Sequence, residues 1–234
     1  MKRFYNFFLF IAAFFLTNFS YCTQVAGESG SAELNTSTIN MQIAEASIPQ
    51  EGIYDLMLDS VAGPLTYYNQ TDSRWRDFLY GGKDPMSIYG CGPTVMAMLI
   101  TSLTGNQVLP PDVAAWAVAN NCWCPGEGSY HKLIKTGASA YGLTATSLRN
   151  YTVEGIRETL DSGNMIVALM KRGHFTQQGH FIILTRMTSD GLVYIADSNT
   201  YTNSIVGWDP EIIIKELNYN SGNGGPLWII GLPE

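Results

Sequence analysis

A cysteine between two glycines is the first feature of this sequence that could carry chemistry. Cys91 stands in the stretch Tyr89–Thr94, ahead of a proline and a run of apolar residues. Pro93 suits the first position of a helix, because its missing N–H would have no partner there. The run from Val95 to Leu103 has the apolar content of a buried helix, and Gly105 is placed to end it. We therefore expect Cys91 at a helix N-terminus, where free N–H groups and the helix dipole stabilise a thiolate.

A nucleophilic thiolate needs a base, and two histidines late in the chain, His180 and His174, are the candidates. His180 opens the apolar segment that continues as Phe181–Leu184, so its ring would be held at the end of a strand. His174 is followed by the polar stretch 175–179, which is typical of a loop. Because a general base must be held rigidly, we favour His180 over His174.

Asp197 ends the next apolar segment and is the candidate that would orient the base. If the two segments form a hairpin, the Asp197 carboxylate lies beside His180 and stabilises its protonated ring. Asp197 could instead shape a turn with Ser198 and Asn199, which is a common use of aspartate.

The elements that would position these residues change character along the chain. Apolar periodicity and cap residues predict mainly helices first and mainly strands later, which defines an α+β architecture. The expected helices after the Cys91 helix are Pro110–Ala119, Tyr130–Tyr141, Thr152–Gly163 and Asp209–Leu217, and the expected strands are Leu65–Gln70, Met165–Met170, Phe181–Met187, Leu192–Ala196 and Pro226–Leu232.

The N-terminus resembles an export signal. Lys2 and Arg3 precede an apolar run from Phe7 to Leu16, which is too short to span a bilayer comfortably. We expect residues 1–22, or up to 27, to be a signal peptide, so the protein would be secreted or displayed at the cell surface of a bacterium, without a stable membrane span after processing. A retained anchor is the minority interpretation, and bulky Tyr21 before Cys22 argues against a lipoprotein.

The remaining chain divides into an arm and a domain. Residues 23–63 are poor in hydrophobic periodicity and read as a loosely ordered linker or short pro-segment, with a helical turn at Ile53–Leu58. Residues 64–234 have the length of one globular domain. The net charge of −7 argues against a nucleic-acid partner.

Two further cysteines form a Cys-x-Cys pair, Cys122 and Cys124, in a tryptophan-containing loop. A disulfide across one residue would be strained. A zinc site needs more ligands than this pair with His131 provides. We interpret them as loop thiols, and no metal or cofactor is implied.

Four stretches together resemble the papain-like cysteine peptidases, and within them the bacterial branch around the bacteriocin-processing, double-glycine peptidases of family thirty-nine. The likeness covers roughly Leu65 to Trp208 and rests on Tyr68–Trp75, Gly90–Thr94 with Ala97-Met98, Gly179–Ile182 and Ala196–Ser198. The resemblance implies a helical first half, with the nucleophile at a helix N-terminus, packed on an antiparallel sheet from the second half.

The same resemblance implies a role for each site residue. Cys91 would be the nucleophile, His180 the general base and acid, Asp197 the orienting residue and Gln70 the side-chain oxyanion donor. The separation of Gln70 and Cys91, 91 − 70 = 21 positions, is longer than in papain, so a loop must fold back. Gln70 could instead satisfy backbone groups in a turn.

The sequence thus predicts a cysteine peptidase acting on a peptide or protein. Two alternatives stay open: a cell-wall peptide amidase, endopeptidase or transamidase with the same residues, and an inactive surface binding module.

Overall fold

The computed structural model describes residues 52–233, so the expected signal peptide and most of the arm lie outside the described residues. The elements in chain order are β1 (Leu56–Leu58), β2 (Leu65–Tyr67), β3 (Leu79–Tyr80), β4 (Asp84–Pro85), α2 (Met86–Tyr89), α3 (Cys91–Thr104), α4 (Pro110–Ala119), β5 (Trp123–Cys124), β6 (Gly128–Ser129), α5 (Lys132–Ala140), β7 (Thr144–Ser147), α6 (Val153–Asp161), β8 (Met165–Met170), β9 (His180–Met187), β10 (Val193–Asp197), α7 (Tyr201–Ser204), α8 (Pro210–Lys215) and β11 (Leu227–Gly231). None of the helices in this part of the chain is both long and apolar enough to cross a membrane.

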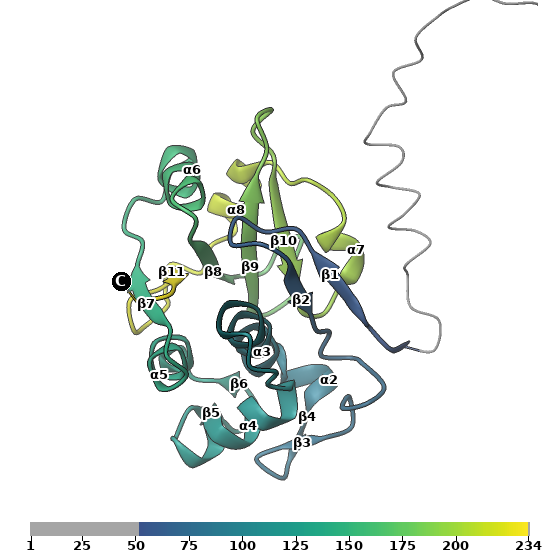
Figure 1. The fold of residues 1–234 in the computed structure, drawn as a ribbon. Helices are drawn as coiled ribbons and strands as arrows, with labels where there is room; N and C mark the ends of the chain where they lie inside the picture. Colours follow the sequence, from purple (N-terminus) through teal and green to yellow (C-terminus); the bar gives the residue numbers. More distant parts are fainter. Residues whose placement is uncertain (1–51, 234) are drawn as a thin grey trace, which may run out of the picture. The chain divides into compact units, whose positions relative to one another are not determined.

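A five-stranded sheet in the order β10-β9-β8-β11-β7 carries the second half of the chain (Figure 1). Every neighbouring pair is antiparallel, as expected. Strands β8 to β11 coincide with the predicted strands to within one residue. Strand β7 was not predicted, and it brings a segment from before the predicted sheet region to the edge beside β11.

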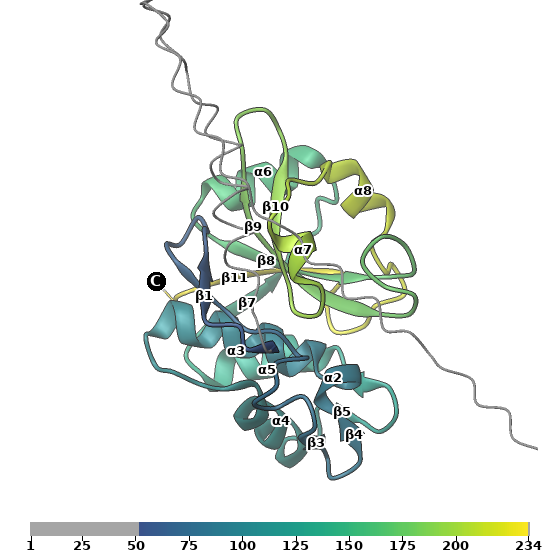
Figure 2. The same cartoon turned by 90° about the vertical axis from the view of Figure 1, so that its right-hand side faces the viewer.

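Both faces of this sheet are covered, which explains why its middle strand, β8, is apolar throughout. Successive side chains of a strand point to opposite faces, so β8 contributes to two separate cores. One core joins Met165, Val167 and Leu169 to helix α3, and the other joins Ile166, Ala168 and Met170 to helices α6 and α8. Figure 2 shows α3 and α5 below the sheet and α6 and α8 above it.

Helix α3 is the central element of the first half. Nine consecutive residues, 92–100, are buried, because the sheet, α4 and α5 pack around the helix. The helix starts at Cys91 rather than at Pro93, so the expectation that the proline takes the first position was wrong. A proline is still tolerated there, since the first-turn N–H groups have no partner within the helix. Gly105 ends α3 in the left-handed conformation, with φ of 73°, as predicted.

Two other helices begin at the predicted capping residues. The Thr152 hydroxyl accepts a hydrogen bond from the Gly155 N–H at 3.1 Å, and Asp209 accepts one from the Glu211 N–H at 2.9 Å. Each satisfies a donor that the helix itself cannot.

The predicted helical turn at Ile53–Leu58 is wrong, because this segment contains strand β1. Leu56 pairs with Tyr67 and Leu58 with Leu65, so β1 lies antiparallel to β2 (Figure 1). The pairing supplies the backbone partners that decide the conformation. Strand β1 falls within the stretch predicted to be a loose arm, while the proposed boundary at residue 64 remains a prediction.

Candidate active site

Two close approaches fix the backbone on either side of Cys91. A Cβ at Gly90 would lie 2.4 Å from the Met86 carbonyl oxygen, and a Cβ at Gly92 would lie 2.7 Å from Ser129 Oγ. Neither position accepts a larger residue without movement. The half-buried Cys91 side chain is thereby held at the first residue of α3, with the buried body of the helix behind it.

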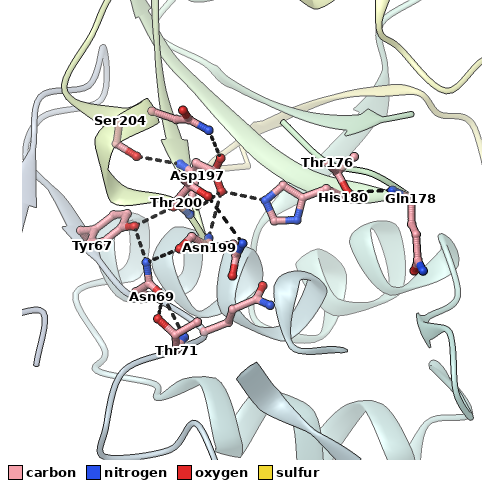
Figure 3. Close-up of polar contacts among 12 residues, drawn as sticks. Tyr67, Asn69, Thr71, Thr176, Gln178, His180, Asp197, Asn199, Thr200 and Ser204 are labelled. Atoms are coloured by element: carbon pink, nitrogen blue, oxygen red, sulfur yellow. Dashed lines mark hydrogen bonds and ion pairs between the residues drawn. The ribbon is translucent and has the colours of Figure 1, made fainter. Parts of the chain in front are cut away.

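The two strands β9 and β10 bring His180 and Asp197 together, as the hairpin argument predicted. His180 is the first residue of β9 and Asp197 the last of β10. His180 Nε2 lies 2.7 Å from Asp197 Oδ1, and both side chains are almost fully buried. Figure 3 shows the imidazole pointing at the carboxylate.

The Asp197 carboxylate is held by a dense set of donors (Figure 3). Besides His180, Oδ1 accepts the backbone N–H groups of Asn199 at 2.9 Å and Thr200 at 3.1 Å. Oδ2 accepts from Asn203 Nδ2 at 2.8 Å. Burial alone would raise the pKa of Asp197, but His180 and then these donors outweigh it and lower the pKa. The carboxylate therefore stays ionised beside the imidazole.

The backbone of Asp197 is also fixed. Its N–H donates to Ser204 Oγ at 2.9 Å, and its carbonyl oxygen accepts from Tyr67 Oη at 2.7 Å. Asn69 Nδ2 in turn donates to Tyr67 Oη at 2.9 Å and to the Asn199 carbonyl at 3.0 Å. These neighbours were not identified from the sequence. Asn69 lies inside a stretch already singled out, whereas nothing in the sequence pattern marks Tyr67 or Ser204.

The His180 ring also contacts the Cys91 thiol, and each of the two groups shifts the pKa of the other. Burial would raise the pKa of the Cys91 thiol, but the hydrogen bond and charge of His180, with the backbone N–H groups of Phe181 and Gly92, lower it. Burial would lower the pKa of His180, but Asp197 and Cys91 together raise it to about 10. The arrangement favours a thiolate beside an imidazolium, which is the pair that nucleophilic thiol chemistry requires.

Gln70 contacts both the turn after Asp197 and the segment that precedes Cys91. Its backbone N–H donates to the Ser198 carbonyl at 2.7 Å, next to Asp197, and its Nε2 donates to the Ser87 carbonyl at 2.9 Å, four residues before Cys91. The chain between Gln70 and Cys91 folds back through β3, β4 and α2, as the long separation demanded. One N–H of the Gln70 amide remains for another acceptor.

His174 lies elsewhere, in the loop between β8 and β9. Its Nδ1 pairs with Glu216 Oε1, and its backbone N–H donates to Glu216 Oε2 at 2.7 Å. The ring packs edge-on against Trp208. The structure thus brings Cys91 to His180 and gives His174 a different carboxylate partner.

The remaining cysteines of the described residues are free thiols. Cys122 is buried, with Sγ 3.4 Å from Thr136 Oγ1, and Cys124 is half-buried in the short β5–β6 hairpin. Within residues 52–233 there is also no group of three or more metal-ligating side chains.

This fold, with a thiol at the start of a buried helix packed on an antiparallel sheet, is that of the papain-like cysteine peptidases. The chain belongs to the Peptidase_C39 like family, whose model matches residues 64–221. It is a cysteine-type peptidase by this membership. The family agrees with the resemblance drawn from the sequence.

Among solved structures, the chain is similar to a double glycine motif protease from an AMS/PCAT transporter, crystallised in complex with the leader peptide. The two share 19% sequence identity with a TM-score of 0.41, over 61% of this chain and 83% of that chain. No curated protein matches the chain.

Proposed function

We propose that this protein hydrolyses peptide bonds with Cys91 as nucleophile, His180 as general base and acid, and Asp197 as the residue that orients His180. The observation that carries the proposal is the position of the buried His180 ring, bonded to Asp197 Oδ1 at 2.7 Å on one side and in contact with the Cys91 thiol on the other. A ring held from both sides keeps its proton and its direction.

The chemistry then follows in two steps. The Cys91 thiolate attacks the carbonyl carbon of the peptide bond, and the C–N bond breaks as the His180 imidazolium gives its proton to the leaving amine nitrogen. The acyl group is left on sulfur as a thioester. His180, now neutral, takes a proton from water, and the resulting hydroxide attacks the thioester carbon and restores the Cys91 thiolate.

Gln70 is proposed as the donor that stabilises the oxyanion formed in each step. Its amide nitrogen is fixed by the bond to the Ser87 carbonyl, and this leaves one N–H whose direction is set. A donor fixed before the reaction costs no reorganisation when the negative charge develops.

A thiol-labelling experiment tests the nucleophile and the base. In the full chain, iodoacetamide should label Cys91 at mildly acidic pH, and Cys91→Ala should abolish that labelling. Cys124→Ala is the matched control and should leave it unchanged. His180→Ala should also abolish labelling at this pH, because the thiolate loses its cation, whereas His174→Ala should not. Labelling of His180→Ala at the wild-type rate would overturn the assignment.

The bond and the location are proposed from the sequence. We infer that the substrate is a peptide or protein met outside the cell, after removal of an N-terminal signal peptide. Parallel digests of unfolded protein and of peptidoglycan test the substrate, and cleavage of peptidoglycan alone would replace the peptidase with a cell-wall enzyme. If Cys91 does not react with an epoxide of the papain-inhibitor type and the protein cleaves neither substrate, the protein is a binding module and not an enzyme. The mass of the exported protein tests the signal peptide.

A further inference from the structure

The segment Gly52–Leu58 precedes the region matched by the family, yet it is tied to the domain at several points. The Gly52 carbonyl accepts the Ser73 N–H at 2.8 Å, and the Tyr54 N–H donates to Asp72 Oδ2 at 2.9 Å. Asp72 is fully buried and is paired with Arg74, which also contacts Asp55 at 2.8 Å. Strand β1 then completes the attachment by pairing with β2.

These contacts place the aromatic ring of Tyr54 against residues that support the candidate site. The half-buried Tyr54 ring packs edge-on against Tyr67, with ring centroids 5.8 Å apart, and against Tyr201, at 6.1 Å. Tyr67 and Tyr201 also contact each other, at 5.4 Å. The three rings form a cluster in which Tyr54 is the member supplied by the N-terminal segment.

Both partners of Tyr54 support the turn that carries Asp197. Tyr67 donates its hydroxyl to the Asp197 carbonyl at 2.7 Å. Tyr201 opens helix α7, and that helix supplies Asn203, which donates to the Asp197 carboxylate, and Ser204, which accepts the Asp197 N–H. Tyr54 is therefore two contacts away from the group that orients His180.

We propose that Tyr54 is a positioning residue for Asp197, and that the segment from Gly52 onward is a required part of the catalytic unit rather than a removable arm. The proposal rests on the proposed function of Asp197. Without the ring, Tyr67 and helix α7 lose a shared packing surface, and the carboxylate is held less closely against His180. A second consequence is that any maturing cleavage in the N-terminal region must fall before Gly52.

The test measures proton binding by His180 in the full chain. The sequence contains only three histidines, so the imidazole signals can be followed one by one by NMR, with His131 and His174 as internal references. Tyr54→Ala should weaken proton binding at His180 by about threefold to tenfold, because Asp197 is a main cause of its raised pKa. Tyr54→Leu keeps part of the apolar volume and replaces the alanine variant if that variant folds poorly. It should weaken proton binding at His180 less than Tyr54→Ala does.

Two controls isolate the ring. Tyr54→Phe keeps the ring and should titrate as wild type, since the described structure shows no hydrogen bond from the Tyr54 hydroxyl. Met57→Ala changes an exposed side chain of the same N-terminal segment and should also leave His180 unchanged. Urea unfolding of each variant measures its stability separately.

The outcomes separate this proposal from the proposed function. If Tyr54→Ala and Tyr54→Leu lower stability but leave the His180 titration at its wild-type midpoint, Tyr54 only stabilises the fold and the positioning role is refuted. If wild-type His180 itself titrates near the ordinary histidine pKa and Cys91 is not labelled at acidic pH, the proposed function fails instead.

Discussion

Replacing Asp197 by asparagine is the sharpest test of the electrostatics of this site. The change keeps the shape of the side chain and removes its charge. Oδ1 can still accept from His180 and from the N–H groups of Asn199 and Thr200. At the position of Oδ2, however, the new amide nitrogen would face Asn203 Nδ2, so two hydrogen-bond donors would face each other.

The expected size of the effect follows from the geometry of the pair. Two unit charges about 4 Å apart interact by about 4 kcal/mol at an effective dielectric constant of about 20, which corresponds to about 3 pKa units. That is an upper bound, because the N–H groups of Asn199 and Thr200, which the variant retains, already offset part of the Asp197 charge. We therefore expect the His180 pKa to fall by about 1 to 3 units from its raised value of about 10.

NMR titration of the His180 imidazole in Asp197→Asn measures this directly, without a substrate. The second measurement is the rate of peptide cleavage, whose loss at alkaline pH should begin 1 to 3 units lower, since the leaving amine needs the imidazolium proton. The double variant Asp197→Asn/Asn203→Asp restores a donor–acceptor pair between the two positions. It should recover stability to urea more fully than it recovers the His180 pKa, because the charge is now farther from the ring.

A His180 midpoint in Asp197→Asn within a few tenths of a unit of the wild-type value would refute this reasoning. It would mean that the contact with Cys91, and not the carboxylate, keeps the imidazole charged.

Three further predictions follow from single contacts. Gln70→Ala should lower kcat by about 10²-fold while leaving acidic-pH alkylation of Cys91 unchanged; an equal loss in both would assign Gln70 to the thiolate and not to the oxyanion. Gly92→Ala should destabilise the protein by about 1–3 kcal/mol in urea unfolding, because its Cβ would lie 2.7 Å from Ser129 Oγ, and Gly92→Ala/Ser129→Gly should recover part of the loss; an undisturbed single variant would contradict the close packing. The lowered Cys91 pKa contributes stability that is present above the unfolded thiol pKa of about 8.5 and is lost as pH falls through the folded value. The difference in unfolding free energy between wild type and Cys91→Ala should therefore grow with pH between the folded and unfolded pKa values, by up to about 1.4 kcal/mol per unit; a difference independent of pH would show that folding does not lower the Cys91 pKa.

Much of the fold was predictable because its determinants are local. The strands β8, β9 and β10 carry continuous apolar runs, since both sheet faces are covered, and Gly105, Thr152 and Asp209 mark helix ends by their own chemistry. Strand β7 was missed because Thr144–Ser147 is short and polar and becomes a strand only through its pairing with β11. Strand β1 was misread for the same reason, as β2 decides its conformation.

The residues of the candidate site were likewise predictable only where local sequence determines their position. Cys91, His180 and Asp197 could be chosen because each stands at the end of an apolar segment that places it. The support of Asp197 could not, since the Tyr67 hydroxyl reaches its carbonyl across 130 residues of sequence. Tyr54 is one contact farther still, and it lies in a stretch whose composition gives no sign of a core.

Asp197 itself shows why two interpretations of one residue need not compete. The sequence left open whether it shapes a turn or orients the histidine, and the carboxylate has enough acceptor capacity to do both. Its Oδ1 accepts the N–H groups of Asn199 and Thr200, which is the turn-forming use, and also faces His180 Nε2. The turn is what holds the carboxylate still, so the structural role is the means by which the proposed catalytic role would be performed. Substitutions that spare the charge but disturb the turn, as at Asn203 or Tyr54, should therefore lower the His180 pKa less than Asp197→Asn does.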